Sequence, residues 1–178
     1  MSILKVCRMG HPILRQQARS LSPDQIHSAA LQQLIDDMLE TMEDYEGIGL
    51  AAPQVFQSLR LLVMGYPDAD DSKTNAVPPQ VLINPEWIEQ STKQFEDWEG
   101  CLSIPDIRGV VPRSAAVGVR ALDREGKLVE LDMSGLAARV LQHEIDHLDG
   151  ILFLDRMKDK NTLTFLEEYH RYRQQSEE

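Results

Sequence analysis

The stretch QHEIDHLDG, at residues 142–150, says most about the fold and its chemistry. It places His143 and His147 four residues apart, with Glu144 directly after the first histidine. Positions i and i+4 lie on one face of an α-helix. One divalent ion can therefore bind both imidazoles while the carboxylate stays free to move protons. We expect a metal-binding helix that begins near Ser134 and ends at Gly150.

The third metal ligand decides the class of site, because a catalytic centre keeps three protein ligands and one open position. A protease pattern with a further histidine is excluded, since Phe153 stands where that histidine would be. A second protease pattern uses a glutamate downstream, for which Glu167 is the candidate. The remaining candidate is Cys101, whose thiolate together with two imidazoles suits Zn²⁺ or Fe²⁺. No motif offers a fourth ligand, which favours catalysis over a structural site.

Helical periodicity follows the tetrapeptide SPDQ at residues 22–25, a sequence typical of a capped helix start. The apolar stripe continues through Met42, so we expect one amphipathic helix that ends near Gly47. Strand-like composition predicts extended segments at residues 59–64, 80–84, 87–98, 110–123 and 127–133, the last two as a hairpin. The segment 66–79 is acidic and proline-bearing, which predicts a surface loop. Residues 151–155 look strand-like, and a final amphipathic helix is expected from Asn161.

Composition and charge limit the class of protein. The chain has 178 residues, of which 42% are hydrophobic and 26% charged, as expected for one globular domain spanning residues 1–178. A net charge of −11 argues against direct DNA binding, which needs a basic surface. No apolar run is long enough for a membrane span, so we expect no membrane association. Two cysteines make no disulfide framework, which favours the cytoplasm.

The segment GIGLAAPQ, at residues 47–54, is almost free of large side chains and ends in the amide of Gln54. It can be a simple turn between a helix and a strand. Alternatively, its backbone is one that another group approaches closely, with a single polar side chain aimed at that group.

Three motifs together resemble the signatures of the peptide deformylase family. They are GIGLAAPQ at 47–54, EGCLS at 99–103 and HEIDH at 143–147, and the likeness extends to RMGHPIL at 8–14. It covers essentially the whole chain and is similar to the bacterial form with a C-terminal helix. We therefore expect an α+β fold, with mostly antiparallel short sheets around a central metal-binding helix, an N-terminal helix and a C-terminal helix. The acidic segment 66–79 looks longer than is usual in the family.

The resemblance implies a metal-dependent removal of the formyl group from formyl-methionyl nascent polypeptides. Cys101, His143 and His147 would hold one divalent ion, Fe²⁺ in cells, with Zn²⁺, Ni²⁺ or Co²⁺ also accepted. Metal-activated hydroxide would attack the formyl carbon and release formate. Glu144 would act as general base and then as general acid.

The resemblance also assigns the groups around the reacting atoms. The side-chain amide of Gln54 and the backbone N–H of Leu102 would stabilise the oxyanion. The peptide would pair with backbone and place its first side chain in an apolar slot, and the residues expected to bind it are Ile48, Gly49, Gly100, Leu136 and Val140.

Two other functions are weighed against this one. An endopeptidase would use Glu167 as third ligand, and a binding module would keep the metal only for structure. For partners we expect N-formylmethionyl peptides. A transient ribosome contact through the tail is also implied, because residues 156–173 carry five Lys or Arg against three Asp or Glu.

Overall fold

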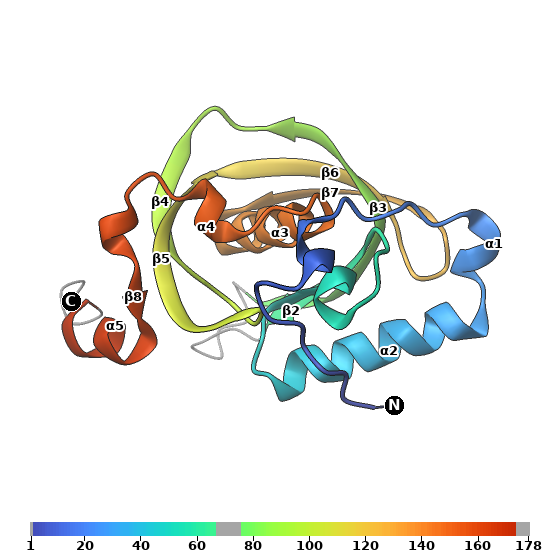
Figure 1. Cartoon of the computed structure of the whole chain (residues 1–178). Coiled ribbons are helices and arrows are strands. Elements are labelled where there is room, and N and C mark those ends of the chain that lie inside the picture. Colours follow the sequence, from blue (N-terminus) through green and yellow to red (C-terminus); the bar gives the residue numbers. More distant parts are fainter. Residues whose placement is uncertain (1, 67–75, 174–178) are drawn as a thin grey trace.

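The helix that carries His143 and His147 runs through the middle of the molecule and is surrounded by strands (Figure 1). It is helix α3, Gly135–Leu148, with Ser134 at its N-cap, so both its start and its end are close to those predicted. The structure is a computed structural model and describes residues 2–66 and 76–173.

The remaining elements follow one another in short steps. The other helices are α1 (Pro23–Ile26), α2 (Ala29–Asp44), α4 (Phe153–Arg156) and α5 (Leu166–Tyr172), and the short 3₁₀ segments are η1 (Pro12–Arg15), η2 (Ala52–Val55) and η3 (Lys160–Thr162). The strands are β1 (Gly49–Ala51), β2 (Leu61–Tyr66), β3 (Val77–Gln90), β4 (Gln94–Cys101), β5 (Ile104–Ser114), β6 (Ala116–Leu122), β7 (Leu128–Ser134) and β8 (Thr164–Phe165).

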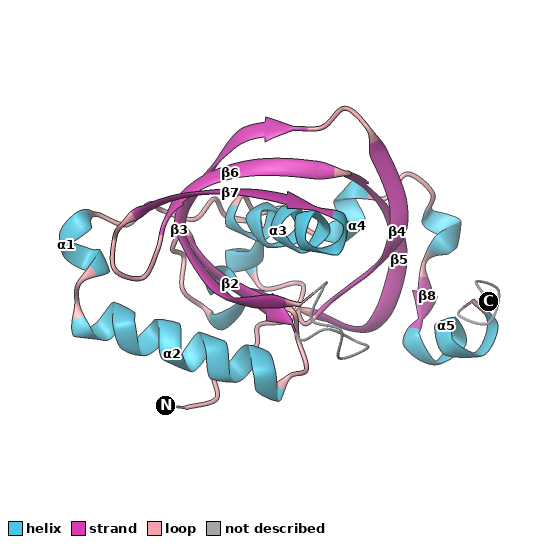
Figure 2. Cartoon of the chain, turned by 180° about the vertical axis from the view of Figure 1, so that it is seen from behind, coloured by secondary structure: helices cyan, strands magenta, loops and turns pink. Residues whose placement is uncertain are grey.

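The strands form two antiparallel sheets. One has the order β1-β2-β3-β6-β7, and the other has the order β4-β5-β8. Figure 2 shows both sheets bending around α3, while α2 lies outside the larger one. Strands β1 and β4 each occupy the end of their sheet, so each has one edge without a neighbouring strand among the described residues. The architecture confirms the predicted α+β class.

Strand β2 is buried on both faces, which explains its uninterrupted apolar sequence. Leu62 and Met64 belong to the core between this sheet and α3. Leu61 and Val63 point to the opposite face and pack in the core under α2. Because successive side chains of a strand alternate between faces, one short strand joins both cores.

The predicted single helix from residue 22 to Gly47 is wrong, because the chain forms two helices there. Helix α1 ends at Ile26 with His27 as its C-cap, and the hydroxyl of Ser28 accepts the N–H of Leu31 to start α2. An N-cap serine favours a new helix start over continuation of the old one. The apolar spacing runs across this break, so periodicity alone did not reveal it.

Two predicted strands are also divided. Segment 87–98 contains the end of β3 and the start of β4, with a turn at residues 91–93. Segment 110–123 contains the end of β5, from residue 110 to Ser114, and all of β6, and the two strands lie in different sheets on either side of Ala115. The predicted hairpin therefore consists of β6 and β7 alone.

The C-terminal part of the chain differs most from the sequence prediction. Residues 153–156 form helix α4 rather than a strand, and the carboxylate of Asp155 accepts the N–H of Leu152 at its start. The tail helix begins at Leu166 rather than Asn161, after η3 and β8. Of the predicted loop 66–79, Tyr66 ends β2 and Val77 begins β3, while residues 67–75 lie outside the described part. Within the described residues, no helix is long and apolar enough to cross a membrane.

Helix α3 ends in a Schellman motif that holds the N-terminal segment against it. The N–H of Ile151 donates to the carbonyl of Asp146 at 2.9 Å, and that of Gly150 to the carbonyl of His147 at 3.3 Å. Gly150 has φ +75°, and a Cβ there would lie 2.8 Å from the backbone carbon of Arg15. The position needs glycine both for its dihedral angle and for space.

We expect Gly150→Ala to destabilise the protein more than Gly135→Ala. Gly135 also has positive φ, at +58°, but a Cβ there would meet nothing within 4 Å. Both variants should lose about 1 to 2 kcal/mol from the left-handed conformation. Gly150→Ala should lose roughly 1 to 3 kcal/mol more from overpacking against backbone. Urea denaturation of the two variants measures the difference, and equal losses would show that the Arg15 contact does not constrain residue 150.

Candidate metal centre

The three predicted ligands, Cys101, His143 and His147, come together, and two of them, Cys101 and His143, line a cavity. Their donor atoms all lie within 4.8 Å of one another, and all three residues are buried. The closest approach is between Cys101 Sγ and His147 Nε2, at 3.2 Å. Among the described residues, this is the group of His, Cys, Asp and Glu side chains that could hold a metal ion.

The backbone explains how Cys101 reaches the helix. The two histidines are one turn apart on α3, as their spacing predicts. Cys101 is the last residue of β4, and the pairing of β4 with β5 shifts between Glu99 and Cys101, leaving Gly100 without a partner in the register. A bulge of this kind turns a side chain away from its regular direction in the sheet.

A buried carboxylate fixes the orientation of one histidine. Oxygen Oε2 of Glu99 lies 3.0 Å from His143 Nδ1, which leaves Nε2 of that ring as the available ligand atom. Glu99 is held in turn by Arg113, at 2.9 Å, and by Arg139, at 2.7 Å. Burial alone would raise the pKa of Glu99, but hydrogen bonds from His143 and Arg113 lower it well below its usual range.

The donor set fits one divalent ion. A thiolate and two imidazoles are ligands that Zn²⁺, Fe²⁺ and similar ions accept. Burial lowers the pKa of His147 well below its usual value, which keeps this ring neutral and able to bind a metal. The group contains no fourth protein ligand among the described residues, so a coordination position is left for a reactant.

Glu144 lies beside the metal ligands with its carboxylate against the backbone of β1. A Cβ added at Gly49 would lie 2.5 Å from Glu144 Oε1. The other oxygen, Oε2, is buried and has no hydrogen-bond partner among the described residues. Burial raises the pKa of this carboxyl to about 7. Such a group can accept or donate a proton near neutral pH.

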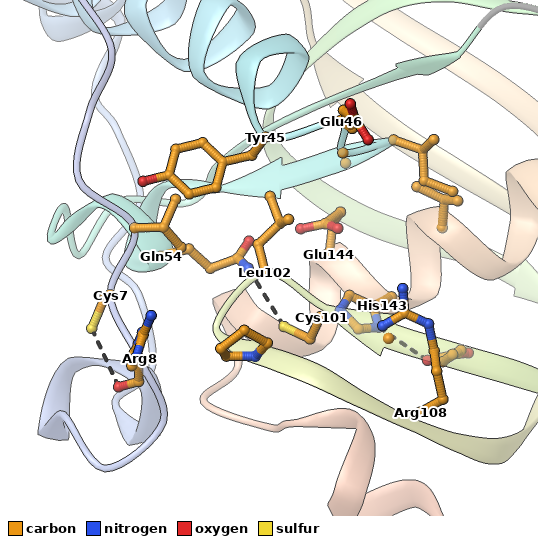
Figure 3. Close-up of a pocket in the computed structure, with 18 of the residues that line it drawn as sticks. Cys7, Arg8, Tyr45, Glu46, Gln54, Cys101, Leu102, Arg108, His143 and Glu144 are labelled. Carbon is orange, nitrogen blue, oxygen red and sulfur yellow. Dashed lines mark hydrogen bonds and ion pairs between the residues drawn. The ribbon is translucent and has the colours of Figure 1, made fainter. Parts of the chain in front are cut away.

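The amide of Gln54 points at the same centre (Figure 3). The backbone N–H of Ala51 donates to Gln54 Oε1 at 2.8 Å, which fixes the orientation of the amide. Its Nε2 then faces Ser103 Oγ, at 3.3 Å, and Cys101 Sγ, at 3.6 Å. Leu102 lies in the turn between β4 and β5 and also lines the cavity.

The cavity has a volume of about 1080 Å³ and is lined by residues of both β1 and β4, the strands with a free edge. All of the residues expected to bind substrate line it, namely Ile48, Gly49, Gly100, Leu136 and Val140. Val140 is buried, whereas Ile48 and Leu136 are exposed at the rim. All expected site residues except His147 therefore line one cavity.

The other candidate ligand is not brought to the centre. Glu167 lies on α5, its side chain is 78% exposed, and it pairs with Arg171 at 3.0 Å. Phe153, which occupies the position of a histidine in one protease pattern, stacks on His143 with ring centroids 6.3 Å apart. Asp146, on α3, pairs with Arg113 and with Arg156, each at 2.6 Å.

Sequence reasoning missed several residues around the centre. The supporting cluster of Glu99, Arg113 and Arg139 was not identified, although Glu99 stands in the EGCLS motif two residues before Cys101. The N-terminal segment at residues 5–8 and Leu166 of the tail also line the cavity. No local pattern marks residues 5–7 or Leu166, because only the fold brings them to the site.

Comparison with known proteins identifies the same family that the three sequence motifs resemble. A sequence model described as polypeptide deformylase matches residues 3–162. The chain is 44% identical over 169 residues to peptide deformylase 2 of Nostoc sp., covering 91% of this chain and 90% of that protein. It is 47% identical over 158 residues to the peptide deformylase of Salinibacter ruber, covering 86% of this chain and 80% of that one.

Solved structures agree with the sequence relatives. The class I type b peptide deformylase from Acinetobacter baumannii, bound to Met-Ala-Ser, has a TM-score of 0.82 at 40% identity, covering 88% of this chain and 100% of that chain. A peptide deformylase from Synechococcus elongatus, in complex with actinonin, has a TM-score of 0.79 at 38% identity, covering 94% and 86%. The chain therefore belongs to the polypeptide deformylase family, metal-dependent hydrolases that remove formyl groups from nascent peptides.

Proposed function

We propose that Cys101, His143 and His147 hold a divalent ion with which this chain removes the formyl group from formyl-methionyl nascent polypeptides and releases formate. The observation that carries the proposal is the meeting of Cys101 Sγ with His147 Nε2, at 3.2 Å, beside the unpartnered carboxylate of Glu144. When bound, the ion supplies Lewis acidity that brings the pKa of water from 15.7 down to about 7.

Glu144 moves the proton. Its carboxylate takes the proton of the attacking water and then gives it to the nitrogen of the departing amine. A pKa of about 7 suits both steps, because the group ionises and reprotonates readily near neutral pH. No hydrogen bond to Oε2 from the described residues competes for the proton.

Two donors stabilise the negative oxygen that forms when the formyl carbon becomes tetrahedral. They are Nε2 of Gln54 and the backbone N–H of Leu102. The bond from Ala51 to Gln54 Oε1 supports this role, because it holds the amide nitrogen toward the centre before substrate arrives. Loss of one such donor typically raises the barrier by about 3 kcal/mol.

The peptide binds in extended form between the free edges of β1 and β4. The carbonyl of Ile48 already accepts the N–H of Gly65 at 3.1 Å. The backbone groups of successive residues in a strand point to opposite edges. The N–H and C=O of Gly49 therefore face the open edge of β1 and are available to the peptide. Gly100, unpaired in the β4 register, offers backbone on the other side. Methionine fills the apolar slot of Ile48, Leu136 and Val140.

The working ion is Fe²⁺ in cells, and the same ligands accept Zn²⁺, Ni²⁺ or Co²⁺. The chain acts as one domain in the cytoplasm, where two unpaired cysteines are stable. Its tail makes a transient contact with the ribosome, supported by the basic bias of residues 156–173.

Replacing Glu144 tests the proton-transfer step. Glu144→Ala, and the isosteric Glu144→Gln, should lower formate release from formyl-Met peptides by at least about 10²-fold. Metal content should stay at the wild-type level, because Glu144 is not a ligand. Formate is measured on anaerobically purified protein together with metal analysis. Full activity in Glu144→Ala would remove the proposed role.

Replacing the candidate third ligands separates a deformylase centre from an endopeptidase centre. Cys101→Ser should lower metal affinity sharply, since a thiolate is exchanged for a neutral hydroxyl. Glu167→Ala should leave metal content unchanged, because that side chain is exposed and pairs with Arg171. Equilibrium dialysis against Zn²⁺ measures both affinities, and the reverse pattern would favour the endopeptidase.

The contact between Gly49 and Glu144 predicts a defect in the chemical step. Gly49→Ala would place a Cβ 2.5 Å from Glu144 Oε1 and push the carboxylate aside. Because catalysis is sensitive to small displacements of a reacting group, this change should lower kcat by roughly 10²-fold with little change in KM. Shortening the partner by one methylene makes room, so the double variant with Glu144→Asp should lose less than the product of the two single losses. The packing argument is contradicted if the loss in the double variant equals the product of the two single losses, or if Gly49→Ala raises only KM.

A further inference from the structure

Helix α4, Phe153–Arg156, contacts the metal helix at two points. Phe153 is buried and stacks on the ring of His143, with centroids 6.3 Å apart. Three residues later, the guanidinium of Arg156 donates two hydrogen bonds to the carboxylate of Asp146, at 3.0 and 2.6 Å. Residues three apart in a helix lie on the same side of it. One side of α4 therefore contacts both a predicted metal ligand and a buried acid of α3.

A charged line, formed by Arg156, Asp146, Arg113 and Glu99, leads from α4 to the metal centre. Arg113 Nη1 lies 2.6 Å from Asp146 Oδ2. The other two nitrogens of Arg113, Nε and Nη2, donate to the two oxygens of Glu99 at 2.9 and 3.0 Å. Glu99 Oε2 then lies 3.0 Å from His143 Nδ1. Every step is within hydrogen-bond distance, so the line is continuous from α4 to the imidazole.

The charged line reaches solvent at its outer end. The side chains of Glu99, Arg113 and Asp146 are between 4% and 8% exposed, whereas that of Arg156 is 47% exposed. Buried ions are stable only when they are fully paired, because they have lost their hydration. Arg113 is shared between two carboxylates, and Arg156 supplies one of these, Asp146, with a second partner. Without Arg156, both carboxylates would compete for the single guanidinium of Arg113.

We infer that Arg156 is a positioning residue for the metal centre and acts through the charged line on the ring of His143. With Asp146 paired by Arg156, Arg113 can hold both oxygens of Glu99. A fixed carboxylate at Nδ1 sets the tautomer and the direction of a metal-binding imidazole. Arg156 does not line the cavity, so its effect reaches the ion without contact with ion or peptide. The inference rests on the proposed function, since it needs His143 to bind the ion through Nε2.

Arg156→Gln tests the charged line at its exposed end, where the substitution leaves the apolar core unchanged. A residue that contacts a metal ligand directly typically changes metal affinity by about 10- to 100-fold. Because Arg156 lies three ion pairs further out, Arg156→Gln should weaken Co²⁺ binding by about three- to tenfold. The visible absorption bands of bound Co²⁺, which report the geometry of its ligands, should shift relative to wild type. Titration of metal-free protein with Co²⁺ under anaerobic conditions measures both.

Arg15→Gln is the matched control, because Arg15 pairs with Asp155 of the same helix and is 48% exposed. This substitution removes the same charge and an ion pair of α4 but leaves the charged line complete. The variant should keep the wild-type affinity for Co²⁺ and the wild-type spectrum. Thermal unfolding of the metal-free proteins shows whether each variant has kept its fold.

Two results would overturn the inference while leaving the proposed function intact. One is a folded Arg156→Gln protein that binds Co²⁺ with the affinity and spectrum of wild type. The other is an equal loss of affinity in Arg15→Gln, which would assign the effect to α4 as a whole. If wild-type protein binds no Co²⁺ with thiolate-to-metal absorption, the proposed centre itself is wrong, and the inference with it.

Discussion

The carboxylate of Glu99 is the contact on which the geometry of the centre depends. It joins β4 to α3 through His143 and to β5 through Arg113, and it also binds Arg139 of α3. Buried charges are tolerated only when paired and hydrogen-bonded, and this carboxylate has three such partners. A rigid Glu99 fixes the ring of His143 and, two residues later along β4, the position of Cys101. The helix and the smaller sheet therefore cannot shift independently without disturbing the ligands.

The two glycine-bearing segments act mainly by leaving space. Gly49 lies under the carboxylate of Glu144, and Gly100 lies under the guanidinium of Arg108. Neither has positive φ, so backbone freedom does not explain them. What they provide is close approach between a strand and a long side chain of another element. Both also lie on strands with a free edge, β1 and β4, which is where an extended peptide can add.

The position of α3 beside the edges of two sheets also explains which reaction the site can support. The HEIDH motif alone fits several hydrolases, because it supplies only two ligands and a base. The third ligand comes from β4 of the smaller sheet, while Gly49 comes from β1 at the edge of the larger one and Gln54 from η2, which follows β1. The helix thus contributes the reacting groups, and the two edges contribute the remaining ligand, an oxyanion donor and the walls for the peptide.

The sequence by itself determined the metal helix, a strand predicted at residues 59–64 and the three motifs, because their signals are local spacing and composition. It also identified Cys101 as a candidate third ligand from its chemistry, and Gln54 as an oxyanion donor through resemblance. Local patterns failed where tertiary partners decide. Strand composition ran through Ala115 without indicating that β5 and β6 join different sheets, and apolar spacing crossed the helix break at Ser28. The pairings of Glu99 and the arrival of Leu166 at the cavity were decided only by the tertiary structure. Each joins residues more than ten positions apart, and chain sequence alone does not encode which distant groups will share a buried space.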